Sequence, residues 1–234
     1  MVAAFAQTRA EILGRIADAA TRAGRAPATV RIVAVSKTVE PRRIAEAAAA
    51  GWDAFGENRV QERAAKADEL VGIRAAWHLV GPLQSNKVRR AVELFDVIET
   101  VDSIELAARL DRIAGEVRPG RPLRVLLQAN VDDDPGKAGF EPAALERDLT
   151  GILELPNLRV DGVMTVGRLV ERAADARPTF VALRSLGERL RASDGRLGSE
   201  LSMGMSEDFP VAVEEGATIV RIGRAIFGAR PALG

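Results

Sequence analysis

The sequence predicts a single (β/α)8 TIM barrel, an α/β fold, with an extra helix before the first strand. Short apolar runs alternate with segments of helical apolar spacing through about eight repeats, whereas doubly wound sheets usually have fewer strands. The 234 residues match the length of such a barrel, and 47% of them are hydrophobic, which is enough for a large core. No linker or shift in composition divides the chain, so residues 1–234 are predicted to form one domain.

The first repeat shows the signals from which the elements are predicted. Apolar residues at helical spacing from Ile12 to Ala23 predict the extra helix, and Gly24 ends it. The apolar run that starts at Ile32 and reaches Lys37 is typical of a strand buried on both faces. Pro41 fits the first turn of a helix.

The later repeats follow the same pattern, and glycine and proline residues mark most of their boundaries. The further strands are predicted over residues 52–55, 75–80, 96–100, 123–129, 158–166, 200–203 and 218–222. The helices are predicted over residues 41–50, 60–70, 85–94, 104–117, 142–155, 179–192 and 209–215, with a last helix after residue 223. Residues 132–137 are predicted to form a polar loop.

The composition argues against several classes of function. Basic and acidic residues are equal at 33 each, so no overall field favours nucleic acid or an anionic membrane. Aromatic residues make up 4%, which argues against a base-stacking surface, and cysteine is absent. The sequence shows neither a signal-peptide pattern nor a run long enough to span a bilayer, so we expect a soluble, cytoplasmic protein.

Lys37 is the first candidate for chemistry, because it ends the most apolar part of the first repeat. Burial disfavours the ammonium form, and a neutral amine attacks an aldehyde to give an imine. The alternative is a lysine that merely extends its amine to water and caps the strand end.

Polar or glycine-rich clusters follow most of the predicted strands, at the end of the barrel where chemistry is usually found. The loops after the seventh and eighth strands often bind phosphate in barrels. Here glycines let backbone amides approach an anion, and Ser202 and Ser206 can donate hydroxyl groups. A lysine facing such loops describes a pocket for an aldehyde phosphate. The clusters are Lys37, residues 56–58, His78 with Gly81, Asn130, residues 164–165, residues 202–206 and residues 221–224.

Other charged residues have structural alternatives. Strand alternation places His78, the single histidine, toward the barrel axis, where it is either a core side chain or a site residue. Arg221 lies among β-branched residues and needs either a buried ion-pair partner or a ligand. Glu57 and Glu62 are expected on a solvated helix face. Residues 132–134 lack the spacing of a calcium loop, and no metal site is predicted.

Five motifs, in order along nearly the whole chain, resemble those of the pyridoxal phosphate homeostasis proteins. That resemblance implies an alanine-racemase-like barrel without a second domain. The motifs are Val33-Ala34-Val35-Ser36-Lys37-Thr38, Phe55-Gly56-Glu57-Asn58 with Val60-Gln61-Glu62, Trp77-His78 with Gly81-Pro82-Leu83-Gln84-Ser85-Asn86-Lys87, Leu201-Ser202-Met203-Gly204-Met205-Ser206, and Val220-Arg221-Ile222-Gly223 through Ala225-Ile226-Phe227-Gly228.

The resemblance implies that pyridoxal 5′-phosphate (PLP) is held as an aldimine of Lys37. It places the remaining cofactor-binding residues around the ring and the phosphate. Asn58 and His78 are expected near the ring and its 3-hydroxyl, Arg221 at the pyridine nitrogen, and Ser202, Met203, Gly204, Gly223 and Arg224 around the phosphate loops. Arg224 stands where the family usually has threonine, so a guanidinium would replace a hydroxyl. Residues 162–168 are also less typical of the family.

The leading hypothesis is a non-catalytic protein that buffers PLP or delivers it to PLP-dependent apo-enzymes. An amino-acid racemase is the alternative, but racemisation needs proton-transfer groups on both faces of the cofactor, and the related racemases use a tyrosine that this chain lacks. A Schiff-base aldolase acting on sugar phosphates is the third possibility. A monomer is expected, because no long apolar stripe is left over.

Overall fold

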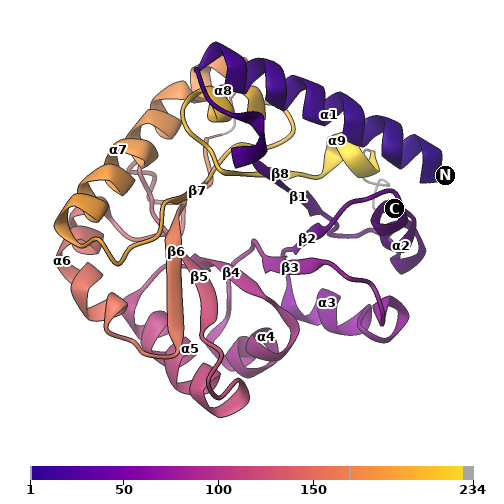
Figure 1. The fold of residues 1–234 in the computed structure, drawn as a ribbon. Coiled ribbons are helices and arrows are strands. Elements are labelled where there is room, and N and C mark those ends of the chain that lie inside the picture. Colours follow the sequence, from indigo (N-terminus) through magenta and orange to yellow (C-terminus); the bar gives the residue numbers. More distant parts are fainter. Residues whose placement is uncertain (1, 169, 229–234) are drawn as a thin grey trace.

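The computed structural model describes residues 2–168 and 170–228, which form a closed barrel of parallel strands ringed by helices (Figure 1). Each strand pairs with its neighbours in sequence, and β8 pairs with β1 to close the ring. The predicted (β/α)8 class is confirmed. The strands are β1 (Arg31–Val35), β2 (Ala54–Glu57), β3 (Ala76–Leu79), β4 (Val97–Val101), β5 (Leu123–Gln128), β6 (Leu158–Met164), β7 (Glu200–Ser202) and β8 (Ile219–Ile222).

The helices cover the outside of the barrel, and short 3-10 turns precede or follow several of them. The α-helices are α1 (Val2–Arg22), α2 (Pro41–Ala49), α3 (Val60–Ala65), α4 (Val88–Leu94), α5 (Ile104–Val117), α6 (Pro142–Leu153), α7 (Arg177–Ser193), α8 (Phe209–Glu214) and α9 (Arg224–Phe227). The 3-10 turns are η1 (Pro27–Thr29), η2 (Asp68–Leu70), η3 (Ser85–Lys87) and η4 (Ala173–Ala176). None of the described helices combines the length and the apolar character that a bilayer span requires.

The extra helix α1 begins earlier than predicted and packs beside α8 and α9, where the two ends of the barrel sheet meet (Figure 1). Its residue Phe5 packs edge-on against Phe227 of α9, with 5.7 Å between the ring centroids. Trp52 lies under the same helix and donates its indole N–H to the carbonyl of Phe5 at 3.3 Å. The first helix therefore stabilises the side of the barrel where β8 meets β1.

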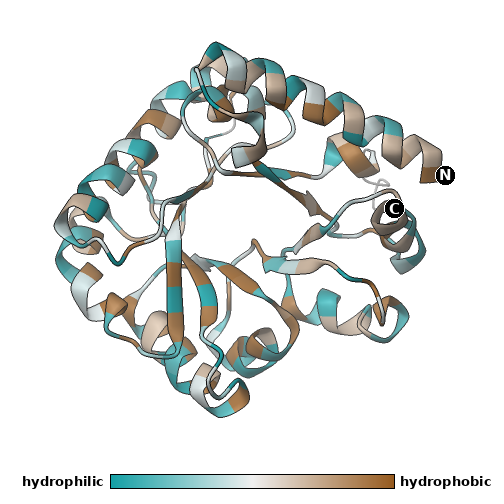
Figure 2. Cartoon of the chain, viewed as in Figure 1, coloured by the Kyte–Doolittle hydropathy of each residue, from teal (hydrophilic) through white to brown (hydrophobic). Residues whose placement is uncertain are grey.

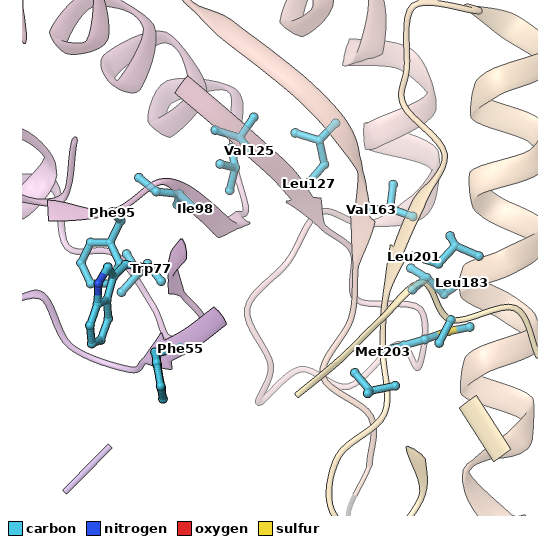
Figure 3. Close-up of a cluster of buried hydrophobic side chains, with 14 of the residues drawn as sticks. Phe55, Trp77, Phe95, Ile98, Val125, Leu127, Val163, Leu183, Leu201 and Met203 are labelled. Carbon is cyan, nitrogen blue, oxygen red and sulfur yellow. The ribbon is translucent and has the colours of Figure 1, made fainter. Parts of the chain in front are cut away.

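The larger part of the core lies between the barrel and its helices. Figure 3 shows Phe55, Trp77 and Phe95 clustered near β2 and β3, and Leu183 of α7 facing Leu201 and Met203. All these side chains are buried, which follows from strands whose outward positions are apolar. Hydrophobic and hydrophilic residues alternate along β6, as Figure 2 shows.

A smaller apolar cluster fills the inside of the barrel, and its position tells which side chains point to the axis. It contains Val33, Leu126, Met164 and Ile219, one from each of four strands. Because side chains alternate along a strand, residues two positions further along point the same way. The axis-facing positions near the carboxyl ends of the strands therefore include His78, as predicted, and Arg221.

Candidate functional site

Lys37 lies two residues beyond β1, in the turn that leads to α2, and it is half-buried. In the pairing of β1 with β8, Ala34 lies beside Ile222. This register brings Gly223, the residue after β8, to the end of β1. The approach is close, because a Cβ atom added to Gly223 would lie 3.2 Å from the carbonyl oxygen of Val35. The lysine and the glycine-led turn into α9 are therefore neighbours at the mouth of the barrel.

Polar side chains from four strands form a hydrogen-bonded chain across the inside of the barrel. The Nδ1 atom of His78 contacts Glu99 Oε1 at 2.6 Å, and the hydroxyl of Ser202 donates to Glu99 Oε2 at 2.5 Å. Arg221 donates to Ser202 Oγ at 2.6 Å and to the carbonyl of Thr165 at 2.7 Å. His78, Glu99, Ser202 and Arg221 are each at most 5% exposed, so water does not screen these contacts.

The charges in this buried chain compensate one another. Burial by itself raises the pKa of Glu99, but its hydrogen bond and charge interaction with His78, together with Arg221 and Ser202, outweigh that effect and hold the pKa below its ordinary value. Glu99 is therefore a carboxylate, an acceptor only, and His78 Nδ1 carries the proton between them. Burial lowers the pKa of the Arg221 guanidinium, whose nearest carboxylate contact is with Glu99 at 3.9 Å.

Asn58 lies at the rim, directly after β2, and is half-buried. Its backbone is fixed by close packing against Gly81, since a Cβ atom at Gly81 would lie 2.3 Å from the Asn58 carbonyl oxygen. Asn58 also borders an open pocket of about 650 Å³. The pocket is lined by Asn58, Arg59, Val60, Gln61, Pro82, Gln84 and Lys87.

The loops that follow β7 and β8 meet at the start of α9. The hydroxyl of Ser206 lies 3.5 Å from the backbone nitrogen of Ala225, in the first turn of that helix. Gly204 has a φ of 91° and its carbonyl accepts a hydrogen bond from the backbone N–H of Arg221 at 3.0 Å, which ties the loop after β7 to β8. The side of the mouth next to Lys37 thus contains the Ser206 hydroxyl, the backbone amides at the start of α9, and the glycines of these loops.

Arg224 begins α9 beside these groups, and its side chain forms an ion pair with the residue that follows Ser206. Its guanidinium pairs with Glu207 at 3.3 Å, and the two side chains are 66% and 75% exposed. An ion pair in such contact with water contributes little to stability. The Arg224 guanidinium contacts Glu207 in this structure, and its contact to a phosphate stays a prediction.

Two of the residues predicted around the phosphate loops have fully buried side chains. The hydroxyl of Ser202 is fully buried and engaged with Glu99 and Arg221, so it is Ser206 that brings a hydroxyl to α9. The side chain of Met203 is also fully buried and packs in the outer core near Leu183, as Figure 3 shows.

The prediction that Glu57 and Glu62 lie on a solvated helix face is wrong for Glu57, which ends β2, whereas Glu62 lies on α3 but is half-buried. Glu57 is fully buried and accepts hydrogen bonds from Ser36 Oγ at 2.8 Å and Lys66 Nζ at 2.9 Å. Glu62 accepts from Lys66 at 3.0 Å and from the backbone N–H of Thr38. Both carboxylates therefore brace the segment around Lys37, on the outer side of the barrel.

Sequence reasoning missed Glu99 and Lys66 as parts of this region. A signal for Glu99 exists, because it interrupts a mostly apolar strand just as Arg221 does. Two buried residues of opposite charge are expected to pair, since an unpaired buried charge is costly. Lys66 gives no comparable signal, since it ends a short charged helix that reads as exposed. Asn130, grouped with the strand-end clusters, instead donates to the carbonyl of Asp134 at 2.8 Å and holds its own loop.

The chain matches the family described as alanine racemase, N-terminal domain, over residues 12–231. It is 43% identical over 229 residues to the pyridoxal phosphate homeostasis protein of Pseudomonas aeruginosa, covering 97% of this chain and 96% of the relative. It is 41% identical over 235 residues to the protein of the same name from Escherichia coli K12, covering 97% of each.

Solved structures agree with this assignment. PipY of Synechococcus elongatus, determined with PLP bound, has a TM-score of 0.81 at 44% identity and covers 91% of this chain and 100% of that one. Alanine racemase of Clostridium difficile has a TM-score of 0.70 at 15% identity, covering 94% of this chain and 56% of that one, a likeness that extends to the fold alone. The chain belongs to the pyridoxal phosphate homeostasis proteins, within the family of the alanine racemase N-terminal domain.

Proposed function

We propose that this protein binds PLP through a Schiff base on Lys37 and acts in PLP homeostasis. The observation that carries the proposal is the neighbourhood of Lys37 and Gly223, set by the pairing of β1 with β8. At this mouth of the barrel, the lysine amine can react with the aldehyde of an aldehyde phosphate, and the backbone at the start of α9 can bind its phosphate. PipY, 44% identical and solved with PLP bound, supports the same ligand.

The residues at the mouth fit the parts of this cofactor. The backbone around Gly223 and Ala225, with the hydroxyl of Ser206, offers donors to the phosphate, as nests of amides and hydroxyls do for anions. Asn58 and His78 are proposed beside the ring and its 3-hydroxyl.

The remaining predicted residues are proposed to act through their backbone or from beneath the ring. Gly204 and Met203 contribute main chain, and Arg224 contributes its backbone N–H. Ser202 is proposed to hold Arg221 in place.

Arg221 is proposed to face the pyridine nitrogen. A guanidinium there disfavours protonation of that nitrogen, so the ring withdraws electrons weakly when bound. The buried hydrogen bonds to Ser202 and Thr165 keep the guanidinium from turning away. A weak electron sink suits storage better than amino-acid chemistry, so we propose buffering of PLP or its delivery to apo-enzymes.

Three further features belong to the proposal. Residues 1–234 are proposed to be one PLP-binding domain, whose outermost residues lie outside the described part of the chain. The protein is proposed to act as a monomer and in the cytoplasm.

The test is the spectrum of the protein after incubation with PLP and dialysis, followed by borohydride reduction and peptide mapping. We expect a visible absorption band in the wild type, a reduced adduct on the peptide that contains Lys37, and loss of both in Lys37→Ala. Lys87→Ala, which removes another half-buried lysine near the mouth, is the matched control and should keep both. A colourless wild type, or an adduct on a different lysine, would refute the proposal.

A further inference from the structure

Lys37 occupies an unusual backbone turn. The turn spans residues 36–39 and is closed by a hydrogen bond from the N–H of Val39 to the carbonyl of Ser36 at 3.0 Å. Thr38, directly after the lysine, has a φ of 63°. That left-handed region suits glycine or asparagine, whereas a β-branched residue is strained there. Something in the surrounding structure must therefore hold this turn.

The ammonium group of Lys66 is bonded to both sides of the lysine turn, directly and through a carboxylate. Lys66 Nζ donates to the carbonyl of Ser36 at 3.0 Å, to Glu57 Oε1 at 2.9 Å and to Glu62 Oε1 at 3.0 Å. An ammonium has three N–H donors, and each of them has an acceptor here. Lys66 itself is only 8% exposed, so these bonds are shielded from water.

The two carboxylates continue the contacts to the turn. Glu57 Oε1 also accepts from the hydroxyl of Ser36 at 2.8 Å, before Lys37. Glu62 Oε1 also accepts from the backbone N–H of Thr38, after Lys37. The residues on both sides of the lysine are thus fastened to one cluster, consisting of Glu57, Glu62 and Lys66, which is built on the end of β2 and on α3.

We propose that the Glu57–Glu62–Lys66 cluster is a positioning device that holds the Lys37 turn in the conformation in which its amine meets the aldehyde. The inference rests on the proposed Schiff base at Lys37. In that step the neutral amine and the aldehyde condense to an imine and release one water, made from the carbonyl oxygen and the two amine hydrogens. No electrons change hands and no other reactant is needed.

The bonding pattern of Glu62 allows a sharp test. The same oxygen of Glu62 accepts from Lys66 and from the Thr38 N–H, so the amide oxygen of Glu62→Gln can take over both contacts. Glu62→Ala removes them. Both variants remove the same charge, so a difference between them reports the hydrogen bonds to the turn and not the electrostatics.

The probe is 5-deoxypyridoxal, which keeps the aldehyde, ring and 3-hydroxyl of the cofactor but has no phosphate. Its condensation with Lys37 is followed by absorbance and by borohydride trapping. In parallel, inorganic phosphate is titrated as a competitor of PLP, which reports the anion side alone. The wild type defines full condensation of the probe, and Lys37→Ala defines the signal without condensation.

We expect Glu62→Ala to weaken condensation of the probe about tenfold, because small displacements of a reacting group have effects of that order. Glu62→Gln should remain close to wild type, and the inhibition constant of phosphate should be unchanged in both. Equal losses in Glu62→Ala and Glu62→Gln, or no loss in either, would overturn the positioning role. Parallel weakening of phosphate would overturn it too, since general damage affects both ends of the site.

Two further variants keep the result independent of folding. Lys66→Met combined with Glu57→Gln removes the centre of the cluster and leaves no fully buried charge unpaired, because Glu62 is half-buried and keeps the Thr38 N–H; it should lose the probe as Glu62→Ala does. Arg124→Met breaks a partly buried ion pair with Asp161 at 2.6 Å and should leave the probe unaffected. If neither the probe nor PLP is trapped at Lys37 in the wild type, the proposed function fails. If the wild type traps them but Glu62→Ala and Glu62→Gln bind the probe equally well, only the positioning role fails.

Discussion

Replacing Glu99 with glutamine tests the buried chain inside the barrel. Glu99 accepts from His78 through one oxygen and from Ser202 through the other, and it is fully buried. Glutamine keeps one acceptor but puts an N–H₂ group in place of the second. If the amide oxygen stays with His78, the hydroxyl of Ser202 loses its acceptor, and Arg221 loses its carboxylate neighbour at 3.9 Å.

The expected loss of stability is large for an isosteric change. Breaking a buried charge pair from one side destabilises a protein by roughly 3–5 kcal/mol, and we expect the lower end because the side-chain shape is kept. For a chain of this size, about 3 kcal/mol corresponds to a fall in the unfolding midpoint of roughly 6–12 °C. Urea and thermal unfolding at neutral pH measure this directly. Glu116→Gln, at an exposed pair with Arg89 and Arg112, is the control and should leave the midpoint unchanged.

The pH dependence provides a second measurement on the same variant. The pKa of Glu99 is lowered in the folded protein, so its stabilising effect is full above the pKa of the unfolded chain. It is lost as the pH falls through the lowered, folded value. The difference in stability between wild type and Glu99→Gln should therefore shrink on acidification. A loss below about 1 kcal/mol at neutral pH, or a difference that grows in acid, would refute the assigned charge network.

The other predictions concern packing and the rim of the site. Gly81→Ala should lower the free energy of unfolding by about 1–3 kcal/mol, measured in urea, because the added Cβ would collide with the carbonyl of Asn58. It should also weaken PLP binding. If both values are unchanged, the loop moves freely and the packing argument is wrong. Arg224→Thr should leave both the unfolding midpoint and the PLP affinity intact, since the guanidinium pairs with exposed Glu207; a clear fall in affinity would reveal a phosphate contact. Phe55→Ala should lower stability by roughly 3–5 kcal/mol, because the ring is fully buried, and a loss under 1 kcal/mol would contradict that packing.

The sequence was sufficient to predict the barrel because each repeat carries its own local signals. The helix predicted over residues 104–117 has those bounds in the structure, and Ser103 caps it by accepting from the N–H of Leu106 at 3.2 Å. The first helix was predicted too short, since its beginning is held by Phe5 on Phe227, a contact between distant parts of the chain. Local patterns do not contain such contacts.

The site residues divide in the same way: those with local sequence signals could be predicted, and those whose place depends on contacts between distant parts of the chain could not. Alternation along a strand was enough to direct His78 to the barrel axis, and the burial of Arg221 among β-branched residues was enough to predict that it needs a partner. Glu99 carries a signal of its own as a charge inside an apolar strand, but its pairing with both residues follows only from the closure of the strands into a ring. Glu57 was misplaced because a glutamate beside other charged residues normally lies in water, whereas here the ammonium of Lys66 makes its burial possible.

The pairing of the first strand with the last also has a consequence for biosynthesis. A ribosome releases the segment with Lys37 early and the segment with Gly223 only near the end of the described chain. A partly made polypeptide thus has the amine of Lys37 but not the backbone amides near Gly223 that are proposed to bind the phosphate. We expect vitamin B6 to be captured only once the ring has closed, so that unfinished or truncated chains leave the cellular supply untouched.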